Sequence, residues 1–488
     1  MMAPEIWTLV LAFSCGLFTA GLLGPHDLGV LRIVGLVAMY APLLGLGTRE
    51  GAIQQAPALV GRDQPEEARK LLDVAFSFTV TTTLIIAVPA LLLCYFFHLF
   101  STTIIFGLAM LTVQLLFYEY TNSLTGKHRI FFRFHYVSRV RLIQSTLNAI
   151  GKAAGSWWAG LWGAFLSNPL SWIIPALYLK SRKEEHLVFR WEPSTAFQLM
   201  KVGFPILAGR MLSVLFDSLD RWFLLGVYHA QAVGYYSFAF TIPGLLLMMA
   251  IRGISVFAQY LRVEWGSHHD SATSWGYTRI FFSLILLASL PASLLAAEAL
   301  RLILHHILPQ YRPGEIFIPP LFLAVNLQII FHLFNAFFTA IEQLRSMVKY
   351  QIMAVVLSAL ANVAAVTLTR SYGMVAIAWA TVIANLMLVL LQTIALARQK
   401  HYLSWQNSIV FLFTAIYLYG SLWLMYSSNS LPQNMPNQLA VRLGLICFPA
   451  LIALPLVFKL RLWPQLVPLF QHAQHKVNTS NENTTDHA

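Results

Sequence analysis

Four polar residues in one segment recur at helical spacing, and two of them are bases. Arg141, Ser145, Asn148 and Lys152 are separated by four, three and four residues, so a helix carries all of them on one face. Arginine binds phosphate oxygens through its planar fork, and lysine contributes a point charge. The stripe therefore predicts binding of an anion rather than the breaking of a covalent bond.

A second segment places acids beside bases. Arg210, Asp217 and Arg221 share a helical face, Asp220 adjoins them, and Asp217 precedes Arg221 in the favourable acid-first order. Two interpretations are open. Either the residues form a structural ion pair, or the carboxylates hold a coupling ion or proton whose binding responds to the neighbouring arginine.

The remaining candidates are single ionisable residues, and no catalytic motif accompanies them. Arg32, Arg49 and Glu119 lie within apolar runs or at their ends. The sequence contains no nucleophile elbow, dinucleotide-binding glycine turn, Walker loop or His-Glu-x-x-His zinc motif. The three cysteines are isolated within apolar runs and lack metal-ligand spacing. We therefore expect no enzymatic activity, no cofactor and no metal site.

The composition indicates that these residues lie in a protein surrounded by lipid. Of the 488 residues, 58% are hydrophobic and 11% are charged, whereas soluble domains carry about 25% charged residues. The apolar residues form runs of about 20, the length with which a helix crosses the hydrocarbon core. Strands of a membrane barrel alternate in character, and these runs do not. The sequence predicts an all-α polytopic membrane protein.

We expect about fourteen transmembrane helices with both termini in the cytoplasm. Of the 32 Lys and Arg residues, 24 lie in the loops and tail on the side of the N-terminus, and the opposite loops carry only three. By the positive-inside rule the richer side is cytoplasmic, so the net charge of +12 reflects topology rather than a nucleic-acid-binding face. The predicted spans are 5–23, 28–48, 74–97, 101–121, 137–156, 160–180, 199–226, 232–257, 277–297, 316–338, 347–369, 373–397, 407–427 and 438–459.

The chain contains two weak copies of one six-helix unit. A shift of 205 residues aligns Gly29 with Gly234, and a shift of 214 aligns Gln114 with Gln328. Copies with an even number of spans share one orientation, so a pseudo-two-fold axis along the membrane normal relates them and the substrate site lies between them. We expect an N-lobe at 1–198, a C-lobe at 199–400, two extra transmembrane helices at 401–469 and a disordered cytoplasmic tail at 470–488.

Charges inside a span are costly, and by default they face a cavity or a partner. Arg141 has a second interpretation, because it lies near the cytoplasmic end of its span and can snorkel to the interface. Lys152 lies about three turns further into the membrane, from where it can still snorkel to the opposite interface. Its counterpart in the second copy is Val366. A basic face in only one copy indicates function rather than scaffold.

These residues divide into two predicted sets. The first set lines a cavity for an anionic substrate and comprises Arg141, Asn148, Lys152, Arg210, Arg32 and Arg49. The second set acts in ion coupling and comprises Asp217, Asp220, Arg221 and Glu119.

Three runs of the sequence resemble Wzx-type polysaccharide flippases. Leu22–Gly29 (LLGPHDLG) and Leu44–Ala52 (LGLGTREGA) resemble the opening of that family, with Leu28 in place of the usual aromatic residue. Asp220–Leu224 (DRWFL), followed by VGYYS from Val233, resembles the signature of its second lobe. The resemblance covers roughly residues 5–400 and includes the 205-residue register of the repeat.

This resemblance implies membership of the multidrug/oligosaccharidyl-lipid/polysaccharide exporter superfamily. It implies a flippase that moves undecaprenyl-diphosphate-linked oligosaccharide from the cytoplasmic to the periplasmic leaflet of a bacterial inner membrane, by ion-coupled alternating access. The product would serve O-antigen, capsule or exopolysaccharide biosynthesis. The implied partners are the polyprenyl-diphosphate-linked glycan, membrane lipid, and the polymerase and chain-length proteins of the same pathway. Because the family core usually has twelve spans, the two extra ones make lipid-II-type flippases a close neighbour.

Two alternative functions remain open. A cation-coupled multidrug exporter shares the fold, but a cavity for cationic drugs needs an excess of acids, and here bases outnumber acids. A membrane polysaccharide polymerase or ligase needs a large periplasmic loop with catalytic groups, and the longest predicted outer segment, 298–315, has about eighteen residues.

Overall fold

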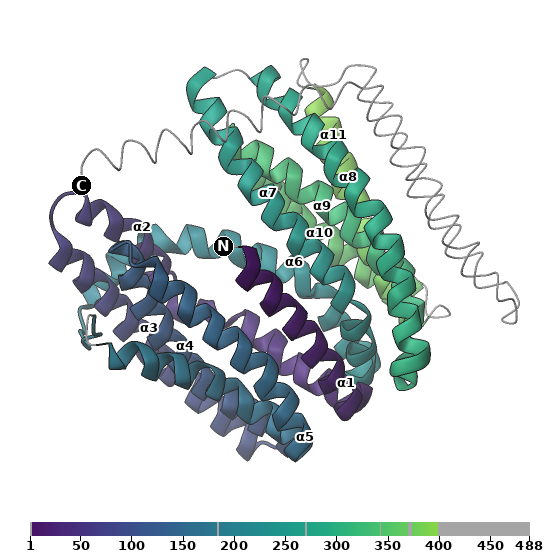
Figure 1. Ribbon diagram of the computed structural model, residues 1–488, viewed down its shortest axis with the longest axis horizontal. Helices are drawn as coiled ribbons and strands as arrows, with labels where there is room; N and C mark the ends of the chain where they lie inside the picture. The colour runs from purple at the N-terminus through teal and green to yellow at the C-terminus, as the bar shows by residue number, and fades with distance from the viewer. Residues whose placement is uncertain (1, 183–184, 269–270, 342, 369–372, 399–488) are drawn as a thin grey trace, which may run out of the picture. The chain divides into compact units, whose positions relative to one another are not determined.

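The described chain is helical throughout, as predicted. The computed structural model describes residues 2–182, 185–268, 271–341, 343–368 and 373–398, and these contain no strand (Figure 1). Eight helical segments are long and apolar enough to cross a membrane. The elements are α1 Met2–Met39, η1 Ala41–Gly45, α2 Thr48–Val60, α3 Pro65–Phe96, α4 Thr102–Ile130, α5 Phe134–Ser181, α6 Pro193–Ala239, α7 Thr241–His268, α8 Ser271–Leu302, η2 Ile303–Ile307, η3 Pro309–Phe317, α9 Ile318–Ala340, α10 Leu344–Leu368 and α11 Val375–Arg398.

Three of the long helices contain a break between predicted spans. The backbone leaves the helical region at Gly24 in α1, at Ala159–Gly160 in α5 and at His229 in α6. Gly24 has φ +71°, a conformation that glycine adopts at little cost, and Pro25 after it disfavours a helical residue at 24. Each predicted span up to 373–397 overlaps a described helix, but 28–48 runs from α1 through η1 to the start of α2, and 232–257 runs from the end of α6 into α7. The spans 407–427 and 438–459 lie outside the described residues, so the total of fourteen stays a prediction.

The helices form two compact units. The first comprises Met1–Ala239, Leu304–Glu315 and Val348–Thr381, and the second comprises Phe240–Ile303, Ile316–Met347 and the described part of Val382–Ala488. The lobe boundaries 1–198 and 199–400 stay a prediction. The segments 401–469 and 470–488 lie outside the described residues.

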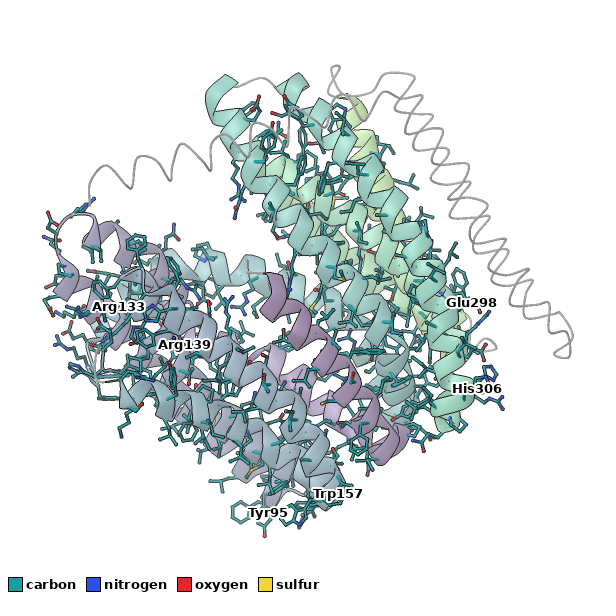
Figure 2. All side chains as sticks on the ribbon, in the orientation of Figure 1. Tyr95, Arg133, Arg139, Trp157, Glu298 and His306 are labelled. Carbon is teal, nitrogen blue, oxygen red and sulfur yellow. The ribbon has the colours of Figure 1, made fainter. Side chains whose placement is uncertain are left out.

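Two apolar clusters hold α5 in the first unit. One gathers around the fully buried Phe165, which fills the space left by Gly107 on α4. The other packs Leu124 of α4 against Tyr136 and Leu179 of α5. In Figure 2, the labelled Arg133 and Arg139 lie at the start of α5 and Trp157 lies just before its break, while Tyr95 lies at the end of α3. The clusters therefore fix the helix that carries the basic stripe along its whole length.

Glycines let α6 approach α1 and α2 closely. A Cβ on Gly29 would lie 1.9 Å from the Ala230 carbonyl oxygen, and a Cβ on Gly234 would lie 1.8 Å from the Pro25 carbonyl oxygen. Pro25 and Gly29 are the counterparts of Ala230 and Gly234 at a shift of 205 residues, so this contact is reciprocal. A reciprocal contact is what a two-fold axis between two copies of a repeat produces.

A second close approach joins the other end of α6 to α2. A Cβ on Gly203 would lie 1.8 Å from the Gly47 carbonyl oxygen, and a Cβ on Gly51 would lie 2.2 Å from the Leu199 carbonyl oxygen. Within lipid, helices associate through such close packing rather than through a hydrophobic driving force. The two glycine contacts set the distance between the helices that carry Arg32, Arg49 and Arg210.

The second unit is built around α9, which is buried along most of its length. Phe282 of α8 stacks on Phe334 of α9 with ring centroids 6.1 Å apart. The Asn326 side chain donates a hydrogen bond to Ser293 Oγ at 3.0 Å and accepts one from Ser289 at 3.0 Å. These bonds satisfy a polar side chain within an apolar helix.

Candidate functional site

The charged residues of the first unit form two groups. We call the group at the predicted periplasmic ends of the helices the outer group, and the group at the cytoplasmic ends the inner group. The outer group comprises Arg32, Lys152, Asp217, Asp220 and Arg221. The inner group comprises Arg49, Glu50, Glu119, Arg129, Arg141 and Arg210.

The outer group brings two bases from different helices together. Arg32 of α1 lies within electrostatic range of Lys152 of α5 and of Arg221 of α6. Arg32 is exposed and Lys152 is half-buried, although both lie in membrane-crossing helices. Within the described part of the chain, neither Arg32 nor Lys152 forms an ion pair or hydrogen bond. Two neighbouring cations without an acid partner attract an anion.

The acids of the outer group have partners of their own. Asp220 accepts a hydrogen bond from the Tyr236 hydroxyl, and a second from the backbone N–H of Arg221 at 2.7 Å. Asp217 lies within electrostatic range of Arg221, as their helical spacing predicts. These contacts are compatible with both interpretations of Asp217, Asp220 and Arg221, so ion coupling stays a prediction.

In the inner group, two of the bases are paired with acids. Arg49 Nη1 lies 3.5 Å from Glu119 Oε1, and the Arg49 guanidinium also lies over the Tyr118 ring, 5.4 Å from its centroid. Arg210 Nη1 lies 3.6 Å from Glu50 Oε1. Both ion pairs are longer than the ~2.7–2.9 Å of a strong charge-assisted hydrogen bond. The residues predicted as one cavity lining therefore differ in their surroundings.

The predicted stripe on α5 connects the two groups. Arg141 is exposed and lies within electrostatic range of Arg129. Arg129 also lies within electrostatic range of Arg49. Asn148 is half-buried between Arg141 and Lys152. The structure therefore places the two ends of the stripe in different charged environments.

Two neighbours of these groups were not predicted from the sequence. Glu50 is the partner of Arg210, and the only signal for it was its position beside Arg49 in the first turn of α2. Tyr311 of η3 is fully buried, donates a hydrogen bond to the Ala20 carbonyl at 3.0 Å and lies within electrostatic range of Arg32. Nothing in the sequence marked Tyr311, because its contact depends on a chain segment almost 300 residues away.

The described residues contain no group of three or more His, Cys, Asp or Glu side chains that could hold a metal ion. Cys15 and Cys94 are free, and Cys447 lies outside the described residues. His305 contacts Glu315 at 3.2 Å and Arg312 at 2.6 Å, which are ordinary polar contacts of one segment.

The fold is similar to those of solved structures of a lipid flippase and of multidrug transporters. The structure is similar to the lipid II flippase MurJ in an inward closed conformation, with TM-score 0.70 and 14% identity over 93% of this chain and 98% of that one. It is also similar to an inward-facing MATE family multidrug resistance transporter, with TM-score 0.64 and 16% identity over 81% and 94%. A third similar structure is a MOP superfamily transporter from Pyrococcus furiosus whose binding pocket is described as reversed in polarity, with TM-score 0.53 and 16% identity over 82% and 92%.

A family model matches part of the sequence. Residues 18–257 match the model of a family described as polysaccharide biosynthesis protein. No curated protein sequence matches the chain. The family match and the fold confirm the resemblance to polysaccharide flippases, and the protein is a multi-pass helical membrane protein.

Proposed function

We propose that this protein flips an undecaprenyl-diphosphate-linked oligosaccharide from the cytoplasmic to the periplasmic leaflet of a bacterial inner membrane. The observation that carries the proposal is the pair of neighbouring bases, Arg32 and Lys152, which lack an acid partner among the described residues. A diphosphate supplies at least two negative charges and several acceptor oxygens to such a pair. Its polyprenyl tail can stay in lipid while the head group crosses.

The comparisons support this choice of substrate class. The matched family is one of polysaccharide biosynthesis, and the first structural neighbour described above is a flippase of a lipid. The remaining parts of the proposal are the ion coupling through Asp217, Asp220, Arg221 and Glu119, the cytoplasmic termini, and the pathway's polymerase and chain-length proteins as partners.

A multidrug exporter is the second candidate, because MATE transporters share the fold. A cavity for cationic drugs needs acids that are free to contact the ligand. In the outer group, the Asp220 carboxylate is occupied by Tyr236 and the Arg221 backbone, and Asp217 is within electrostatic range of Arg221. The bases Arg32 and Lys152 have no such acid partner in the part of the chain that the structure describes, which favours an anionic ligand.

Binding to the purified full chain in nanodiscs tests the proposal. We expect the protein to bind undecaprenyl diphosphate and not undecaprenol. Arg32→Gln or Lys152→Gln should weaken binding at least tenfold, equivalent to about 1.4 kcal/mol. The matched control is Arg62→Gln, because Arg62 is an exposed arginine in the turn between α2 and α3. Equal binding of the diphosphate and the alcohol would overturn the proposal.

A test in cells addresses transport itself. Lys152→Ala and Arg210→Ala should each reduce surface polysaccharide while the amount of protein in the membrane stays normal. Surface polysaccharide at the wild-type level in both variants would contradict a basic site for the substrate.

A further inference from the structure

The two charged groups lie at different depths along one helix. Arg141 belongs to the inner group and Lys152 to the outer group, and both are on α5. Eleven residues of helix separate them, which is about 16 Å at 1.5 Å per residue. This separation is about half of the ~30 Å hydrocarbon core. The two groups therefore lie at different depths of the membrane.

The inner group carries an excess of positive charge. Four arginines, Arg49, Arg129, Arg141 and Arg210, face two acids, Glu50 and Glu119. Arg129 and Arg141 are exposed, and neither forms an ion pair within the described residues. The excess of two charges makes this group a site for an anion as well.

The two groups differ in how tightly their bases are already held. In the inner group, Glu119 and Glu50 compete with any incoming phosphate for Arg49 and Arg210. The pairs at 3.5 and 3.6 Å are loose, so a phosphate with better geometry can replace the carboxylates. Within the described residues, no acid is paired with Arg32 or Lys152 of the outer group, and its acids Asp217 and Asp220 have Arg221 and Tyr236 as neighbours. Because an incoming anion must displace Glu119 and Glu50 to reach Arg49 and Arg210, we expect it to bind those two arginines more weakly than it binds Arg32 and Lys152.

A polar bridge lies between the groups. The Tyr40 hydroxyl lies 2.6 Å from Ser218 Oγ and accepts a hydrogen bond from Trp222 Nε1 at 3.3 Å. Along the chain, Tyr40 is eight residues after Arg32 and nine before Arg49. The bridge joins the residue that follows α1 to α6, at a chain position between Arg32 of the outer group and Arg49 of the inner group.

We propose that the inner group is a second anion site, at which the diphosphate replaces Glu119 and Glu50 on Arg49 and Arg210 before it moves outward to Arg32 and Lys152. The proposal rests on the proposed function and adds an order of events to it. The weaker inner site loads the head group, and the stronger outer site holds it deeper in the protein. Glu119 and Glu50 are then positioning residues, because the head group is released when they re-form their ion pairs with Arg49 and Arg210.

Farnesyl diphosphate is the probe, bound to the purified full chain in nanodiscs and measured by calorimetry. We expect two binding events in the wild type. Lys152→Gln should remove the tighter event, and Arg129→Gln should weaken the other about tenfold. Arg129 is the informative inner residue because its loss breaks no ion pair of the described structure. Arg62→Gln, outside both groups, should leave both events unchanged.

Glu119→Gln distinguishes a competing acid from a purely structural one. With the competitor neutralised, the weaker binding event should become several-fold tighter, and polysaccharide export in cells should fall because release is slowed. A weaker inner event in Glu119→Gln would overturn the proposal. So would a single binding event in the wild type that Arg129→Gln leaves unchanged, and in that case the proposed function stands on Arg32 and Lys152 alone. The absence of any binding to the wild type would overturn the proposed function itself.

Discussion

At the scale of single residues, the most deeply buried charges of the first unit lie outside the candidate site. Lys127 Nζ lies 2.8 Å from Asp73 Oδ1, with the two side chains 2% and 4% exposed. Lys127 also donates to the His186 carbonyl at 2.6 Å, and Asp73 accepts from the backbone N–H of Val188 at 3.1 Å. The pair therefore fastens the segment before α6 to α3 and α4, because each charge satisfies a backbone group of that segment as well as its partner.

The same segment is held by a second acid. Glu185 is 5% exposed and receives two hydrogen bonds from Arg69, at 3.1 and 3.2 Å. Further along, Glu192 contacts Lys70 at 3.1 Å, and this hydrogen bond lowers the pKa of Glu192 below its ordinary value. Arg69 and Lys70 of α3 thus hold Glu185 and Glu192 of the connection between α5 and α6.

Removal of one member of the buried pair should destabilise the protein strongly. Lys127→Met leaves the Asp73 carboxylate buried without its counter-charge, which costs about 3–5 kcal/mol. Thermal unfolding of the purified protein in detergent measures the loss. Lys180→Met is the control, since Lys180 is exposed and such surface changes stay within about 0.5 kcal/mol. Equal melting temperatures of the two variants would show that the pair contributes nothing.

At the scale of elements, the contacts between α6 and its neighbours depend on the absence of side chains. The Gly29 and Gly234 contact brings the break of α1 against the break of α6, and the Gly47, Gly51 and Gly203 contact brings α2 against the start of α6. Backbone atoms occupy the positions where Cβ atoms would lie, so a larger residue cannot be accommodated by turning a side chain. The helices must move apart.

Substitution of these glycines should therefore separate the helices. Gly234→Ala places a Cβ 1.8 Å from the Pro25 carbonyl oxygen, and we expect a loss of at least about 1–3 kcal/mol together with loss of transport. Gly226→Ala is the matched control on the same helix, because nothing lies within 4 Å of the added carbon. There the change should stay within about 1 kcal/mol, and alanine favours the helix. Normal export by Gly234→Ala would show that the close approach is dispensable.

At the scale of the whole molecule, the distribution of charge predicts the orientation in the membrane. The basic residues Arg133 and Arg139 lie at the start of α5, whereas the aromatic residues Trp157, just before the break of α5, and Tyr95, at the end of α3, lie away from them (Figure 2). Trp157 and Trp158 are 73% and 76% exposed. Exposed tryptophans are enriched at the lipid–water interface of membrane proteins. Both features agree with a cytoplasmic side at the turn between α4 and α5.

Cysteine labelling checks this orientation. In a chain without its native cysteines, Ser101→Cys before α4 should react with an impermeant maleimide in intact spheroplasts. Ser181→Cys at the end of α5 should react only after the membrane is opened. Both serines are exposed, so burial within the protein does not shield either position from the maleimide. Labelling in the reverse pattern would invert the predicted topology and, with it, the direction of the proposed transport.

Much of the architecture was predictable because membrane insertion depends on local properties. The thickness of the hydrocarbon core sets the length of each apolar run. The Gly24-Pro25 pair interrupts a helix whatever the tertiary structure around it. The spacing of Arg141, Asn148 and Lys152 was enough to place them on one face of a helix, because helical periodicity is local as well. By itself, the sequence thus determined a helical membrane protein with bases on one stripe.

Only the tertiary structure decided which charges meet. Arg210 shares a helical face with Asp217, yet its ion pair is with Glu50 of α2, and Lys152 neighbours Arg32 from a helix 120 residues earlier. Periodicity states which way a side chain points on its own helix, but the neighbouring helix depends on packing, here on glycine contacts that bring backbones together. That packing divides the predicted set of bases. Arg49 and Arg210 of the inner group are paired with acids, whereas Arg32 and Lys152 of the outer group have no acid partner among the described residues.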